Sequence, residues 1–147
     1  MRDLQSSKNG DFTALAIAGT HTVLLALNCR DKRRKGLLGF SIQREIEGAP
    51  GGLRWLRSLK VFKSIVPDPK NARDPTDASK PARFYTENFP VQSFLWGDYA
   101  ASPGKTHRFR VLPRYGAPGS LRTDPEDEIT ISITTEQEWP SHASCRS

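Results

Sequence analysis

Apolar and polar residues alternate most regularly in the segment that follows Gly104. His107, Phe109, Val111 and Tyr115 fall on one side of this pattern, and the arginines between them fall on the other. A period of two predicts a half-buried antiparallel strand with its arginines turned to solvent. With the apolar segment before it, the stretch 89–116 predicts two antiparallel strands joined by a Ser-Pro-Gly turn.

Other segments have the alternation or the apolar content of strands. They are residues 12–18, 21–28, 37–45 and 129–135. The glycine-rich break at 48–52 is followed by residues 53–66, which we interpret as extended or irregular. Residues 67–88 contain four prolines and form either a plain connection or a binding loop.

This pattern predicts an all-β protein without a substantial helix. Short alternating strands separated by turn signals are typical of an immunoglobulin/fibronectin type III-like antiparallel β-sandwich, here of about seven strands. A closed barrel is the alternative. A chain of 147 residues suits one domain. We expect residues 1–10 to be a flexible lead-in, 11–136 the sandwich, and 137–147 a flexible tail.

Composition narrows the partners only slightly. The net charge of +6 permits anionic partners such as nucleic acid. The N-terminus lacks the apolar core of a secretory signal, and the longest apolar run, 14–27, is too short and polar to span a bilayer. The two cysteines, Cys29 and Cys145, lack metal-ligand spacing. We therefore expect a cytoplasmic protein without a membrane span.

No motif for catalysis is evident in the chain. The three histidines do not form metal-ligand or nucleophile–base patterns, and no glycine-rich phosphate-binding loop precedes a helix. Cys29 follows an apolar strand and is expected to be inert. The carboxylates at 124–128 lie in a turn and are expected to be solvated. We predict no catalytic, cofactor-binding or metal-binding residue.

Basic residues form the candidate binding site. They are Arg30, Lys32, Arg33, Arg34, Lys35, Arg108, Arg110 and Arg114. If the 30–35 loop lies near the arginine face of the strand, the two make a patch suited to phosphates, with Trp96 and Tyr99 close by. In the alternative interpretation, the strand arginines pair with acids from Glu87, Asp98 or the region of Asp127.

Several motifs resemble the N-terminal region of bacterial phospholipase D-like proteins. They are A-x-A-G-T-H-x-V-L-L-A at 16–26, L-L-G-F-x-I-x-R at 37–44, V-Q-S-F-x-W-G-D-Y at 91–99, R-V-x-P-x-Y-G at 110–116 and I-T-T-E at 133–136. With shorter matches at 55–56 and 60–62, the resemblance covers roughly residues 14–136.

The resemblance implies a fibronectin type III-like domain that precedes a catalytic region. Catalysis in that family depends on two His-x-Lys-x-x-x-x-Asp motifs, and this sequence contains no His-x-Lys. The expected function is therefore that of a non-catalytic accessory module, with a phospholipase D-like catalytic region as its partner. The alternative is a stand-alone module that binds nucleic acid or another polyanion.

His107 departs from a common feature of such sandwiches. A tyrosine often stands near this place and bonds back to the backbone through its hydroxyl. A neutral imidazole can donate a similar bond, and its protonation would then make this corner sensitive to pH.

Overall fold

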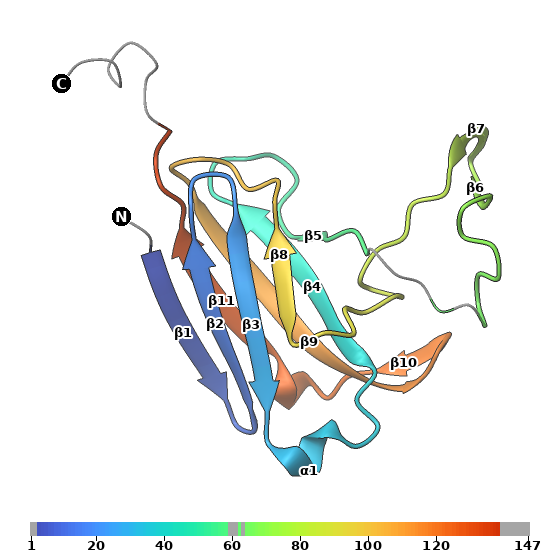
Figure 1. The fold of residues 1–147 in the computed structure, drawn as a ribbon, viewed down its shortest axis with the longest axis horizontal. Helices are drawn as coiled ribbons and strands as arrows, with labels where there is room; N and C mark the ends of the chain where they lie inside the picture. The colour runs from blue at the N-terminus through green and yellow to red at the C-terminus, as the bar shows by residue number, and fades with distance from the viewer. Residues whose placement is uncertain (1–2, 59–61, 63, 139–147) are drawn as a thin grey trace.

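Two antiparallel β-sheets pack face to face in the computed structural model, which describes residues 3–58, 62 and 64–138 (Figure 1). The front sheet has the order β1-β2-β3-β8, with bounds Asp3–Asn9, Phe12–Ala18, Val23–Cys29 and Leu95–Asp98. In the back sheet, β9 pairs with β4, β10 and β11, and β5 pairs with the other edge of β4. The bounds are Gly39–Ile46 for β4, Arg54–Trp55 for β5, Thr106–Ala117 for β9, Ser120–Arg122 for β10 and Ile129–Thr134 for β11.

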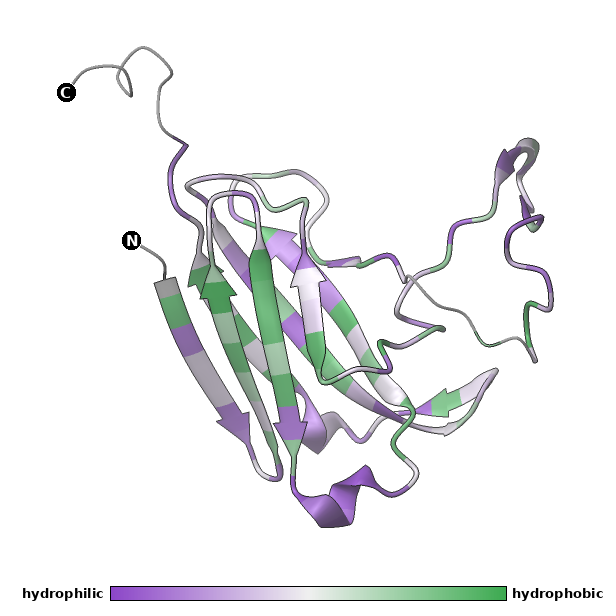
Figure 2. Cartoon of the chain, in the orientation of Figure 1, coloured by the Kyte–Doolittle hydropathy of each residue, from purple (hydrophilic) through white to green (hydrophobic). Residues whose placement is uncertain are grey.

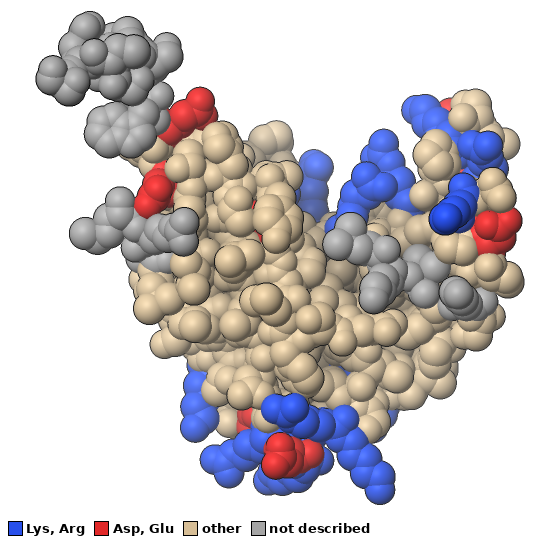
Figure 3. All heavy atoms as spheres, viewed as in Figure 1, with Lys and Arg blue, Asp and Glu red and all other residues tan. Residues whose placement is uncertain are grey.

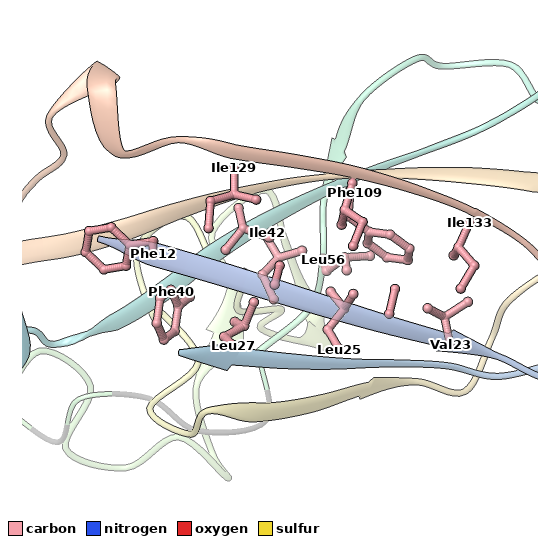
Figure 4. Close-up of a cluster of buried hydrophobic side chains, with 14 of the residues drawn as sticks. Phe12, Val23, Leu25, Leu27, Phe40, Ile42, Leu56, Phe109, Ile129 and Ile133 are labelled. Carbon is pink, nitrogen blue, oxygen red and sulfur yellow. The ribbon is translucent and has the colours of Figure 1, made fainter. Parts of the chain in front are cut away.

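The core lies between the two sheets and is built by alternate residues of each strand. Phe12, Leu25, Phe40, Ile42 and Phe109 are at most 2% exposed and point toward one another from both sheets (Figure 4). Burial of each such side chain contributes roughly 1.5–3 kcal/mol relative to exposure. Apolar residues accordingly concentrate in β2 and β3, whereas α1 (Asp31–Arg34) is hydrophilic (Figure 2).

The predicted all-β sandwich is confirmed. Strands β2, β3, β4, β9 and β11 coincide with predicted segments to within a few residues. On β9 the predicted sides are also correct, because His107, Phe109, Val111 and Tyr115 are buried. Besides α1, the only other helical element of the described residues is the short 3₁₀ turn η1 (Pro125–Asp127).

The predicted hairpin within residues 89–116 is wrong. Strand β8 pairs with β3 in the front sheet, whereas β9 pairs with β4 and β11 in the back sheet. Strands β8 and β9 therefore pack against each other from opposite sheets and are not hydrogen-bonded as a hairpin. The Trp96 and Phe109 rings meet edge to face, with their centres 6.4 Å apart. The connecting segment crosses from sheet to sheet, and its Ala101 N–H donates to the His21 carbonyl at 3.1 Å.

The predicted lead-in at residues 1–10 is also wrong for its described part. Strand β1 pairs with β2 along its whole length, from Asp3 opposite Ala18 to Asn9 opposite Phe12. A tight turn joins them, and Gly10 adopts the φ of +59° that favours glycine. The sequence does not predict this strand because its residues are mostly polar, and strands are recognised in a sequence by the alternation of apolar and polar residues. Of the predicted tail, residues 137 and 138 lie outside any strand, and 139–147 lie outside the described residues.

Between β5 and β8 the chain leaves the sandwich and forms an extended arm (Figure 1). Strands β6 (Arg73–Asp74) and β7 (Asp77–Pro81) pair as a small hairpin at its far end. The arm returns through Tyr85, which forms an isolated antiparallel bridge with Arg57. Residues 67–88, predicted as a long loop, therefore carry a hairpin that projects from the domain.

Candidate interaction surfaces

The three arginines of β9 are held by neighbouring residues. Arg108 donates to Glu45 of β4 at 2.7 Å, and Arg110 forms a two-bond ion pair with Glu128 at 2.5 and 2.8 Å. Arg114 donates to the Thr123 hydroxyl at 3.1 Å and to a backbone carbonyl at 3.2 Å. The interpretation in which the strand arginines pair internally therefore describes Arg108 and Arg110. Glu128 belongs to the expected acidic region around Asp127, whereas Glu45 was not among the expected acids.

These contacts shift the titration of the groups involved. The bond to Arg110 lowers the pKa of Glu128, and the same bond raises the pKa of Arg110. Burial lowers the pKa of Arg114. On the arginine face of β9, the charges of Arg108 and Arg110 are therefore paired with acids, and little of the positive charge of these two residues is free for a polyanion.

The basic 30–35 segment forms α1 and the turns beside it at one end of the sandwich. The Arg33 guanidinium group forms an ion pair with Asp127 at 2.5 Å and lies 5.0 Å from the centre of the Phe12 ring. The Tyr115 hydroxyl donates a hydrogen bond to the backbone carbonyl of Arg33 at 2.5 Å. Arg30 and Lys32 lie 3.4 and 3.7 Å from Asp11. This cluster fastens the end of the front sheet to the back sheet.

Arg108 lies far from the basic 30–35 segment, whereas Arg114 lies near it. Segment α1 leads into β4, whose first residue, Gly39, lies opposite Arg114. Arg108 lies six residues further along β9, about 20 Å away at the rise of a strand. The aromatic residues expected nearby also lie elsewhere: Trp96 packs against the core, and Tyr99 is 75% exposed beyond the end of β8. Arg34 and Lys35 remain exposed on α1 and beside it.

We expect replacement of Arg110 by Gln to lower the free energy of unfolding by about 1 kcal/mol, because it breaks the pair with Glu128. The loss should shrink in 0.5 M NaCl, since salt screens a partly exposed pair. Urea unfolding at low and high salt measures both effects. A patch of unpaired arginines would give the opposite result, since removing one like charge would raise stability at low salt.

His107 makes the backbone bonds anticipated for a neutral ring. It is fully buried; its Nδ1 lies 3.0 Å from the Lys105 carbonyl, and its Nε2 accepts the Ser102 N–H at 3.1 Å. A carbonyl requires a donor, and an N–H requires an acceptor, so the ring carries its proton on Nδ1. Burial lowers the pKa of His107, with the nearby Arg44 adding in the same direction.

Cys29 is a buried free thiol beside α1. Burial raises its pKa, and the opposing charges of Arg34 and Arg33 do not reverse the shift. Because the thiolate is the reactive form, the expectation of an inert cysteine is consistent with this environment. Among the described residues, no three His, Cys, Asp or Glu side chains gather as a metal site would require.

The outer face of the front sheet is a surface that the sequence interpretation missed. Its outward residues form two cross-strand rows: Leu4–Ile17–Leu24–Gly97 and Ser6–Leu15–Ala26–Leu95. Leu4 and Leu95 are 60% and 61% exposed. Lys, Arg, Asp and Glu are absent from the visible middle of this face and gather near its ends (Figure 3).

A shallow hollow of about 1040 Å³ crosses this face. Leu15, Ala26 and Leu95 line its floor, and Lys8 and Arg34 lie at the α1 end. The sequence contains a sign of this apolar surface. In residues 14–27 the outward-facing positions are apolar as well as the inward-facing ones, although the inward-facing ones alone are enough to form the core.

No family model, curated protein or solved structure matches this chain. Among the described residues, no helix has the length and apolar character needed to cross a membrane.

Proposed function

We propose that this chain is a non-catalytic accessory β-sandwich module that docks on a phospholipase D-like catalytic region through the outer face of its front sheet. The observation that carries the proposal is the uncharged apolar middle of that face, with Leu95 61% exposed. Three strands of seven residues and the four-residue β8 give this sheet face an area on the order of 400 Å². Contiguous apolar patches on the surface of soluble proteins are often functional.

Strand order is compatible with the sandwich that the resemblance implies. The adjacency β2-β3-β8 facing β11-β9-β4 can be aligned with the A-B-E and G-F-C strands of immunoglobulin-like sandwiches. In this comparison β1 is an additional strand beside the first. The agreement concerns the scaffold, so the catalytic partner is inferred from the sequence resemblance.

The charges at the rim suggest the chemistry of the partner's surface. Lys8, Arg34 and Lys35 lie toward the α1 end, and Glu136 and Glu138 follow β11 at the other end. A complementary surface would have an apolar centre, acids facing α1 and bases facing the end of β11. Charge complementarity of this kind fixes orientation and speeds association more than it adds affinity.

The chain alone should not hydrolyse bis(p-nitrophenyl) phosphate, because the two catalytic motifs of the resembled family are absent from its sequence. A continuous absorbance assay on the purified chain measures this. Turnover that survives repurification and scales with protein concentration would contradict the proposal.

Docking can be tested with a separately produced phospholipase D-like catalytic region that bears both motifs. We expect Leu15→Glu and Leu95→Glu each to weaken its binding at least tenfold in calorimetry, since each buries a charge in the interface. Ile65→Glu places the same charge on a 46% exposed residue of the arm and should have little effect. Self-association of the chain that both front-sheet variants abolish would instead assign the face to a second copy.

A second candidate function, polyanion binding, is favoured by the exposure of Arg30, Lys32 and Arg34, whose side chains are 64%, 68% and 48% exposed. The ion pairs with Asp11 and Asp31 reduce the free charge of this group. Of the predicted basic residues, those of the 30–35 segment are therefore better placed than Arg108 and Arg110 for this function.

A further inference from the structure

The arm and β5 carry a second set of basic residues whose charges are less neutralised than those of β9. Its exposed members are Arg54, Arg57, Lys70, Arg73, Lys80 and Arg83. Among the described residues, no carboxylate lies within 4.0 Å of the Arg57 or Arg83 guanidinium group, whereas Arg108 and Arg110 are both paired. This contrast singles out the arm as a place where positive charge remains available.

The acids of the arm are engaged in its own turns. Asp74 accepts from the Thr76 N–H at 2.8 Å and hydroxyl at 2.7 Å, and Asp77 accepts from the Ser79 N–H at 3.1 Å and hydroxyl at 2.6 Å. These bonds lower the pKa values of both carboxyls. The two acids thus stabilise the turns of the hairpin. Among the described residues, the only ion pair that they form with a basic residue of the arm is the 3.9 Å contact of Asp77 with Lys80.

Backbone pairing places Arg57 and Arg83 beside an exposed ring. Arg57 lies directly opposite Tyr85 in an antiparallel bridge, flanked by a bond from the Ser58 N–H to the Phe84 carbonyl at 2.8 Å. Residues opposite each other in such a bridge have Cβ atoms about 5 Å apart. Arg83 precedes Tyr85 by two residues, and so extends to the same side of an extended chain.

The opposite side of this segment is anchored to the domain. Phe84 packs edge to face on Phe89 at 5.3 Å, and Thr86 is fully buried. Tyr85 therefore faces outward and is 39% exposed. Because its two neighbours in the chain are anchored, the backbone that carries Tyr85 is held in place, which lowers the conformational cost of binding a ligand there.

A polar hollow of about 370 Å³ adjoins the ring and lies against the hairpin. Its lining residues are Asp74, Pro75, Lys80, Arg83 and Tyr85. Figure 3 shows Lys and Arg side chains around the notch between the arm and the sandwich. The site thus combines two cationic groups, one aromatic face and one carboxylate that accepts hydrogen bonds.

We propose that the Arg57–Tyr85–Arg83 face binds single-stranded nucleic acid. An unpaired base stacks on an exposed aromatic ring, while guanidinium groups contact the phosphates on either side of it. The Asp74 carboxylate favours a ligand with N–H donors, which bases supply and a sulfated polysaccharide supplies sparsely. A duplex is disfavoured because its bases are already stacked. This inference is independent of the docking proposed for the front sheet.

The test is fluorescence anisotropy of a labelled 12-nucleotide mixed-sequence DNA strand with the full chain in 50 mM NaCl. We expect the logarithm of the binding constant to fall linearly with the logarithm of the salt concentration, with a slope of about 0.7 per phosphate contacted. Arg57→Glu and Arg83→Glu should each weaken it at least tenfold. Tyr85→Ala should weaken it roughly 5- to 100-fold, and Tyr85→Phe should retain it, because stacking uses the ring face.

Arg122→Glu is the matched control, because it makes the same charge change at a side chain 65% exposed on β10. It should change affinity less than twofold. Absence of binding at 100 μM protein, or an equal loss in the control, would overturn the proposal. Heparin or anionic vesicles that bind as tightly as the strand, without loss in Tyr85→Ala, would also overturn it by assigning the charges to another polyanion.

Discussion

Replacing Thr86 by Val is expected to destabilise the protein by about 2–3 kcal/mol, although the two side chains have nearly the same shape. The Thr86 hydroxyl accepts the Ile42 N–H at 2.9 Å and donates to the Ile42 carbonyl at 3.0 Å. Both residues are fully buried. Valine would leave the Ile42 N–H without a partner in a site closed to water, and an unsatisfied buried donor costs about 1–3 kcal/mol.

Thr86 has this effect because it fills a gap in the edge of β4. Strand β5 pairs with Gln43 and Arg44, and Val91 pairs with Phe40 further along the same edge. Between these two pairings, the Ile42 carbonyl accepts a hydrogen bond from the Leu56 N–H at 2.9 Å, and the Ile42 N–H donates to the Thr86 side chain. One hydroxyl thus replaces a strand residue and attaches the returning arm to the sandwich.

Thr86→Ser is the control for this prediction. It keeps the hydroxyl and removes one methyl group, so it should cost only about 1 kcal/mol. Urea unfolding of the three proteins gives the free energies, provided that the slope with denaturant is unchanged. A valine variant as stable as the serine variant would mean that the hydroxyl bonds do not contribute to stability.

The elements that the sequence predicted correctly are those whose alternation reflects burial against one core. Strands β9 and β11 are examples: every second residue of β11, from Ile129 to Ile133, is buried. This alternation reflects only which side of its own strand each residue occupies, so it can be recognised without knowing which distant segments pair with the strand. Strand β1 lacked this signal because polar residues form it, and its pairing follows from the turn at Gly10.

Partnerships between distant segments could not be predicted in the same way. Alternation showed that Arg108 and Arg110 face outward, but it did not show that Glu45 and Glu128 would face them from neighbouring strands. The pairing of β8 with β3, and not with β9, likewise depends on which sheet each strand joins. The exposed face of Arg57 and Tyr85 arises from two segments 28 positions apart, neither of which has a motif.

Lowering the pH from 7.5 to 5 is expected to destabilise the protein through His107. Burial lowers the pKa of this residue in the fold, so between its folded and unfolded pKa values the unfolded chain binds more protons. Stability is therefore complete above the unfolded pKa, near 6.5, and falls as the pH decreases below it. One proton sets the steepest slope at about 1.4 kcal/mol per pH unit, and the loss levels off below the folded pKa.

The geometry explains why the ring resists a second proton. Protonated Nε2 would point a hydrogen at the Ser102 N–H, turning a 3.1 Å bond into a contact between two donors. Asp98 and Arg44 form an ion pair, and their two charges act on the pKa of the ring in opposite directions. His107 can therefore remain in place at low pH only if the corner from Ser102 to Lys105 rearranges.

His107→Gln separates this effect from other titrations. Glutamine retains an acceptor for the Ser102 N–H but cannot be protonated in this range. We expect the variant to be about 2 kcal/mol less stable at pH 8, because it packs less well against Phe109, whose ring stacks on His107 at 6.4 Å. The difference from the original protein should narrow steadily between pH 6.5 and 5 in urea unfolding. A constant difference across that range would show that His107 titrates alike in the folded and unfolded chains.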